Sequence, residues 1–187
     1  MRKALPWLVG AGLAAAAVAI TAATPAPETL YTAFPIAGSF APDADPRPVT
    51  SRTLTAVVVD AAFTERVQAD QWHADGNWLV VTVAASAPRS EQDSVIALAS
   101  LHVGGEVFHA SERPRDPLLG ERLRIGIDTA GMLAFELPAD VRGGDAELRL
   151  SSELITPRLD DVIAVGLRLD DIRTVPSIEV EPPEAGP

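Results

Sequence analysis

Short apolar runs separated by proline and glycine dominate the chain after residue 50. Some runs alternate apolar with polar residues and others are continuously apolar, which favours β-strands that are buried on one or both faces. No segment after residue 24 keeps a helical period over three turns. Residues 51–175 are therefore predicted to form one all-β domain, an immunoglobulin-like antiparallel β-sandwich. The expected strands are 52–60, 77–85, 94–103, 106–110, 122–128, 132–137, 146–152 and 162–169.

An uncharged, mostly apolar segment precedes this domain at residues 4–23, directly after Arg2 and Lys3. Its length suits a helix that crosses a bilayer, and the two cations favour a cytoplasmic N-terminus. Residues 1–24 are accordingly predicted to be one N-terminal transmembrane helix, which places the rest of the chain outside the cytoplasm. The small residues at 21–23 leave open a cleaved secretory signal peptide. A buried soluble helix is the third alternative.

Two proline-rich segments flank the predicted sandwich. Residues 25–50 hold six prolines and are predicted to form a semi-rigid spacer. Large apolar side chains within it indicate that part of this segment lies on the domain instead: Leu30, Tyr31, Phe34, Ile36 and Phe40. Residues 176–187 are acidic and rich in proline, a composition typical of a disordered tail.

Composition excludes several classes of chemistry. The chain has no cysteine, so neither disulfides nor thiol catalysis nor cysteine-based zinc sites are available to it. Its formal charge is −11, and the part after residue 24 carries 26 acids against 13 arginines. Such acidity opposes binding to nucleic acid or to anionic lipid headgroups. It serves solubility, or it attracts a cationic partner.

Two histidines are the best candidates for a ligand site. If Gly104 and Gly105 form a hairpin turn, Leu101 faces Phe108, and His102 and His109 share the opposite face about 7 Å apart. Such a pair can begin a metal site, but zinc needs at least one further ligand. Glu112 and Asp116, the next acids after His109, are candidates for it. The alternative is that both histidines simply face solvent, and the pattern as a whole predicts no metal and no cofactor.

Acidic doublets bracket the last expected strand, at Asp160-Asp161 and Asp170-Asp171. Carboxylates in loops can bind calcium, but a strand of this length holds the two doublets about 30 Å apart. Solvated turns are the simpler interpretation. Catalytic motifs are also missing, since no G-x-S-x-G elbow occurs and an acid follows Gly143-Gly144 where a phosphate loop needs a cation. The sequence therefore predicts that the protein is not an enzyme.

Three short segments resemble the telokin-like, immunoprotective-extracellular family. They are the tryptophan-led strand at 78–83, the glycine turn before an aromatic at 101–108, and the glycine-to-proline strand at 131–138. The resemblance implies an immunoglobulin-like sandwich exported by bacteria, often behind an N-terminal anchor, with no known biochemical role. The chain departs from the family at residues 84–86, where the family's asparagine is absent. It also lacks the family's acid before the turn glycine.

The same segments supply the expected core. Trp78 is predicted to lie between the two sheets with Phe108 or Phe135, and Leu101 to face Phe108. Trp72 and His73 fall in a polar stretch and are expected to be exposed.

The functional expectation is an extracytoplasmic interaction module, anchored in the bacterial cytoplasmic membrane by a single span. It would be accessory to a membrane or envelope complex, and it is secreted if the N-terminal segment is cleaved. Its partner is then a protein or another envelope component, with the membrane contacted through the N-terminal helix and no nucleic acid bound. The alternative is an extracytoplasmic sensor or carrier that binds a small ligand or a cation.

Overall fold

Strands make up nearly all the regular structure in the described part of the chain. The computed structural model describes residues 34–88, 92–114, 118–152 and 161–186. Within these ranges the chain is all-β, and the helical element found there is a single 3-10 turn, η1 (Leu169–Asp171). The predicted N-terminal anchor lies outside the described residues. None of the helices within those ranges has the length and apolar character needed to span a membrane.

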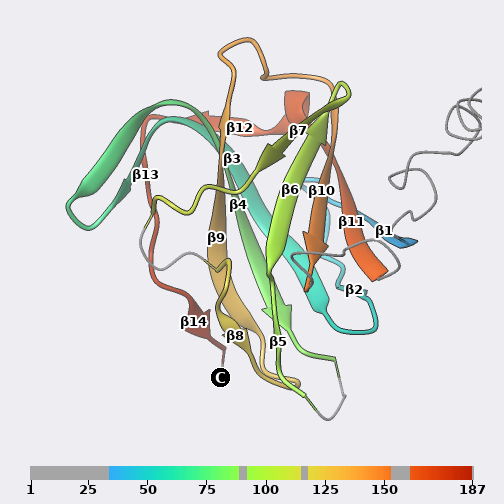
Figure 1. The fold of residues 1–187 in the computed structure, drawn as a ribbon. Coiled ribbons are helices and arrows are strands. Elements are labelled where there is room, and N and C mark those ends of the chain that lie inside the picture. Colours follow the sequence, from blue (N-terminus) through green and yellow to red (C-terminus); the bar gives the residue numbers. More distant parts are fainter. Residues whose placement is uncertain (1–33, 89–91, 115–117, 153–160, 187) are drawn as a thin grey trace, which may run out of the picture. The chain divides into compact units, whose positions relative to one another are not determined.

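Five strands form the smaller sheet, in the order β1-β11-β10-β6-β7 (Figure 1). Its neighbours are antiparallel except for β1 and β11, which run parallel. The bounds are β1 (Phe34–Ser39), β6 (Leu98–Val103), β7 (Glu106–His109), β10 (Asp145–Ser151) and β11 (Asp161–Arg168).

The larger sheet has the order β12-β3-β4-β9-β14, and β2 and β13 also pair with β3. Two long central strands, β3 (Thr55–Ala69) and β4 (Trp72–Ser86), form a hairpin, and β9 (Thr129–Leu137) lies beside β4. The short strands are β2 (Val49–Thr50), β12 (Arg173–Val175), β13 (Ile178–Glu179) and β14 (Glu184–Ala185). A separate two-stranded sheet joins β5 (Ser94–Val95) to β8 (Arg122–Leu123).

The main core lies between the smaller sheet and the larger sheet, as the alternating pattern predicts. Leu79, Val81 and Val83 alternate along β4 and are all fully buried. They share one cluster with Leu101 of β6 and Leu148 of β10. Since successive strand residues point to opposite faces, each of these strands presents every second side chain to the core. The prediction of an all-β, sandwich-like domain is confirmed.

The domain begins earlier in the chain than the sequence predicts. The proline-rich stretch 25–50 was expected to be a spacer, but its described part contributes β1 to the smaller sheet and β2 to the larger one. Proline is tolerated on an edge strand, and Pro35 stands in β1 at the edge of its sheet. Phe40 packs against the main core. The expectation that apolar side chains draw part of this stretch onto the domain was therefore the better one.

The prediction of a disordered tail is also wrong for the described residues 176–186. β13 pairs with β3, β14 pairs with β9, and Val180 is 5% exposed. The prediction of disorder came from the mean composition of the segment, which is acidic and rich in proline. A mean composition does not reveal the contribution of single apolar residues. The two apolar residues Ile178 and Val180 nevertheless pack on the sheet.

Parallel pairing is a second departure from the expected antiparallel sandwich. It occurs where β12 and β13 run beside β3, and again between β1 and β11. Arg173 of β12 is held there by a bidentate contact to Asp60 of β3, with Nη2 2.6 Å from Oδ2. Asp60 adjoins an irregularity in the β3 register after Val58, and a bulge of this kind re-aims side chains. The ion pair thus fastens an edge strand at a kink.

Candidate functional site

The hairpin of β6 and β7 has the predicted register. Leu101 pairs with Phe108 and Val103 with Glu106, which leaves Gly104 and Gly105 as the turn. Both glycines have positive φ angles, 58° and 93°, as a two-residue hairpin turn requires. His102 lies opposite Val107 and His109 opposite Ser100, so both histidines stand on the outer face of the smaller sheet.

Strand registers place these histidines in two rows that cross the whole sheet. One row runs Val107, His102, Glu147, Gly166, Ser39, and the other runs His109, Ser100, Arg149, Ala164, Ala37. The first three positions of each row, on β7, β6 and β10, carry nearly all the polar and charged groups. The last two positions, on β11 and β1, carry only small side chains. We call these two parts the polar half and the smooth half of the outer face.

The polar half is joined internally by hydrogen bonds. Arg149 Nε donates to Glu147 Oε1 at 2.6 Å, and both side chains are 40% exposed. His102 Nε2 lies 3.2 Å from Ser100 Oγ. Partial burial lowers the pKa of His102 below its usual value, and the nearby charge of Arg149 lowers it further. Glu147 acts in the opposite direction, so the sum favours a neutral imidazole within a charged surrounding.

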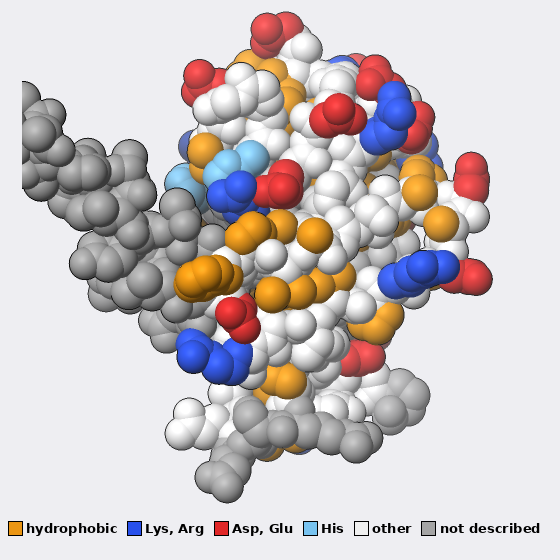
Figure 2. All heavy atoms as spheres, turned by 90° about the vertical axis from the view of Figure 1, so that its right-hand side faces the viewer, with side chains coloured by type: hydrophobic (Ala, Val, Ile, Leu, Met, Phe, Trp, Pro, Cys, Tyr) orange, Lys and Arg blue, Asp and Glu red, His pale blue; other side chains and the backbone are white. Residues whose placement is uncertain are grey.

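The smooth half is exposed at Ala37 and Ser39 but buried at Ala164, which is 3% exposed. A side chain added at Gly166 would meet only the Gly38 carbonyl oxygen, at 3.8 Å. Beyond the edge of β1 the surface falls into a hollow of about 320 Å³, lined by Ala37, Gly38, Ser39, Arg47, Pro48 and Val49. Figure 2 views this side of the molecule and shows apolar side chains beside a group of histidine, basic and acidic side chains.

Metal binding at the two histidines lacks a third ligand within the described part of the chain. No group of three or more histidine, aspartate or glutamate side chains suited to a metal ion is found in residues 34–88, 92–114, 118–152 and 161–186. Asp116, one of the two acids considered from sequence, lies outside these ranges. Glu112 is described and exposed.

One carboxylate of each acidic doublet accepts a hydrogen bond from a backbone amide. Asp161 Oδ2 accepts a hydrogen bond from the Arg52 amide at 2.9 Å. Asp170 Oδ2 accepts one from the Gly144 amide at 2.8 Å and so closes the turn before β10. Asp160 lies outside the described residues. These contacts give two of the four carboxylates a role in fixing loops to strands.

The closeness of Ser100 to His102 escaped the sequence analysis. The signal was available, because residues two apart on a strand share a face, and Ser-x-His on a predicted strand places the two side chains together. Serine beside histidine is the start of a nucleophilic site. However, the hydrogen bond that the structure gives Glu147 goes to Arg149, so the orienting acid of a triad is engaged elsewhere.

The predicted core residues fall into two different clusters. Leu101 and Phe135 are fully buried in the main core, and Phe108 is half-buried against it. Trp78 is also fully buried, but the expectation that it lies between the sheets is wrong. It points to the outer face of the larger sheet because it alternates with Leu79, which takes the inner position. There it joins the outer cluster: Val67, Ala69, Trp78, Val80, Ala134 and Val180.

Comparisons with known proteins give one distant likeness. No family model matches the chain, and no curated protein matches it. The solved structure of "a putative lipoprotein from Staphylococcus aureus subsp. aureus NCTC 8325" is similar to it, with 11% sequence identity and a TM-score of 0.44. The match covers 72% of this chain and 98% of the other.

Proposed function

We propose that this protein is an extracytoplasmic interaction module of a bacterial envelope, held at the membrane by its N-terminal segment. Its immunoglobulin-like sandwich presents the outer face of the smaller sheet to a protein or envelope partner. The observation that carries this proposal is the division of that face into a polar half and a smooth half. An area of small side chains bordered by charged groups is similar to the core and polar rim of a protein contact surface.

Several features of the surface support a protein partner over a small substrate. Val107, at the end of one row, is 46% exposed although it is apolar. The small residues Ala37 and Gly166 let a second backbone approach the sheet closely. The hollow beside β1 offers a place for one protruding side chain, with Arg47 available to pair with an acid.

The N-terminal sequence supports the location. Residues 4–23 are uncharged and follow two cations, so the domain would stand outside the cytoplasm whether the segment is retained or cleaved. A retained anchor also supports binding at this surface, because tethering both partners to one membrane raises their effective concentration.

Site-specific photo-crosslinking in intact cells tests the proposal. A photoreactive phenylalanine analogue replaces Ala37, Val107 or Gly166 in the full chain, one position at a time. We expect the same crosslinked partner from all three positions. The matched controls are Glu65 and Ile125, which are exposed on other parts of the domain.

The pattern of adducts decides the outcome. Crosslinks confined to the three outer-face positions support an interaction surface there. Equal crosslinking from the control positions, or none from any of them, contradicts it. Arg149→Ala and Glu147→Ala are expected to weaken the adduct without unfolding the domain, since both side chains are 40% exposed.

A further inference from the structure

The C-terminal residues 178–186 lie as a strap across the outer face of the larger sheet. β13 runs parallel to β3, with Ile178 beside Val67 and Glu179 beside Gln68. The chain then crosses the same face of the sheet, past β4, to β9, with which β14 pairs. In Figure 1 this path appears as the dark red chain from β13 to β14. The strap therefore joins two strands that β4 separates.

The strap closes the outer cluster. Val180 is 5% exposed and packs in the same cluster as Trp78 and Val80, and its amide donates to the Gln68 carbonyl at 2.7 Å. Ile178 packs against the cluster from its margin. We call the surface that the strap covers its seat. The seat consists of the edge of β3 at residues 67–69, with which the strap pairs, and the valine, alanine and tryptophan side chains of the outer cluster beneath it.

Few hydrogen bonds hold the strap in this seat. β13 and β14 are two residues long each. Pro182 and Pro183 lie between them and have no amide hydrogen to donate. The indole nitrogen of Trp78 is buried in the closed cluster without a hydrogen-bond partner. A buried donor without a partner lowers the stability of the closed cluster.

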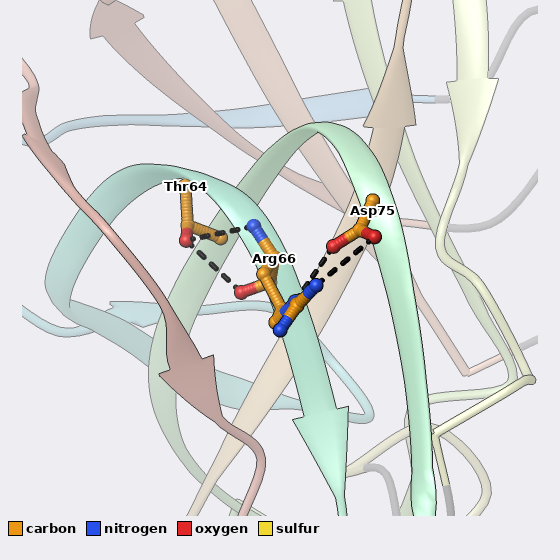
Figure 3. Close-up of polar contacts among 3 residues, drawn as sticks. All are labelled: Thr64, Arg66 and Asp75. Atoms are coloured by element: carbon orange, nitrogen blue, oxygen red, sulfur yellow. Dashed lines mark hydrogen bonds and ion pairs between the residues drawn. The ribbon is translucent and has the colours of Figure 1, made fainter.

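The seat is built independently of the strap. Its strands pair with each other from Arg66 to Asp75, at the end of the β3–β4 hairpin. Thr64 Oγ1 donates to the Arg66 carbonyl at 3.0 Å, and the Arg66 guanidinium meets Asp75 through two hydrogen bonds of 2.6 and 3.1 Å (Figure 3). None of these contacts involves the strap. The hairpin and its free edge are therefore expected to persist when the strap lifts.

We propose that this seat also accepts the strap of a second copy of the protein, so that two copies exchange C-terminal strands. A second copy offers the one segment whose fit is visible in the structure, since residues 178–180 make the same contacts from either chain. The hinge is the two-residue segment Pro176-Ser177, between β12 and β13. Exchange of an identical element between two copies is a low-cost route to a dimer. The exchanged pair is a contact between copies, distinct from the outer face of the smaller sheet.

The absence of cysteine from the chain makes a direct test possible. One full-length copy carries Gln68→Cys and a differently tagged full-length copy carries Glu179→Cys. These positions are paired neighbours in the register, and their side chains point away from the outer cluster. Adjacent strands bring Cα atoms within the range that a disulfide spans. The two copies are mixed under oxidising conditions and analysed on a non-reducing gel.

We expect a disulfide-linked heterodimer whose yield rises with protein concentration. The matched control replaces the second copy by one that carries Asp140→Cys, an exposed thiol outside the strap. Its heterodimer yield should be several-fold lower. Adding Val180→Asp to the Glu179→Cys copy should lower the yield to the same control level, because it removes the side chain that enters the seat.

Two results would overturn the proposal. One is a heterodimer yield no higher than that of the Asp140→Cys control at any concentration. The other is failure of a single chain with both Gln68→Cys and Glu179→Cys to form its internal disulfide, which would contradict the register of the strap itself.

Discussion

Trp72 and Trp78 meet edge to face on the outer side of the larger sheet, with ring centroids 6.4 Å apart and ring planes at 87°. Both belong to β4, yet Trp78 is fully buried and Trp72 is half-buried at its margin. Such a pair contributes about 0.5–1.5 kcal/mol beyond the area it buries. The two rings therefore stabilise the protein as a unit, and the expectation that Trp72 is an exposed loop residue is wrong.

Replacing either tryptophan by alanine should lower the free energy of unfolding by different amounts. We expect a loss of about 3–5 kcal/mol for Trp78→Ala, because a fully buried indole leaves a large cavity. For Trp72→Ala we expect about 1–2 kcal/mol, since only part of its surface is buried. Chemical denaturation followed by circular dichroism measures both.

The double variant then reports the coupling between the rings. We expect it to be less destabilised than the sum of the single variants, by about 0.5–1.5 kcal/mol. Strict additivity would mean that the edge-to-face contact contributes nothing. If Trp78→Ala does not fold, Trp78→Phe replaces it in the cycle.

Gly131 is expected to resist substitution because the side chain of Leu118 occupies the space that a larger residue would need. A Cβ at this position would lie 2.9 Å from Leu118 Cβ, and Leu118 is fully buried. Gly131→Ala should cost about 1–3 kcal/mol, as overpacking does. Gly166→Ala is the matched control, since it is also a strand glycine and its nearest contact is 3.8 Å away. Equal melting temperatures for the two variants would contradict the close contact.

The imidazole of His102 is expected to titrate below its usual pKa of 6.5, because burial and the charge of Arg149 disfavour the protonated form. Arg149→Met should raise the pKa of His102 and Glu147→Gln should lower it. Nitrogen-15 NMR of the imidazole follows both shifts. Opposite or absent shifts would show that the neighbouring charges do not reach the ring.

The same shift has a consequence for stability. The unfolded chain binds the proton of His102 at a higher pH than the folded protein, so this group favours unfolding as pH falls through 6.5. Its stabilising contribution is present above that pH. His102→Gln should therefore be less sensitive than the wild type to acidification from pH 7 to pH 5.

The contact between Asp60 and Arg173 should make a small, acid-sensitive contribution. The hydrogen bond from Arg173 lowers the pKa of Asp60 below 3.8, so the contribution is present above that value and is lost as pH falls through the folded pKa. Both side chains are partly exposed, so Asp60→Asn should cost only about 0.5–1 kcal/mol at pH 7. The difference from wild type should shrink below pH 4. Asp43→Asn, in an exposed loop, is the control and should change little.

Local patterns in the sequence were sufficient for the β6–β7 hairpin. Gly104 and Gly105 fix the turn, the turn fixes the register, and the register places His102 and His109 on one face. Each of these steps depends on neighbours a few residues apart, so alternation and turn chemistry decide them. The sandwich-like, all-β class follows from the same alternation repeated along the chain.

Only tertiary contacts decided which segment of the protein covers each face of a buried strand. The period of β4 puts Trp78 and Leu79 on opposite sides, but nothing local reveals that both sides are buried. The cover for Trp78 comes from Val180, about a hundred residues later, in a segment whose acidity and prolines predict disorder. Likewise β1 became a strand because β11 offered it an edge. Burial between distant segments depends on the partner surface, and a single sequence read locally does not contain that information.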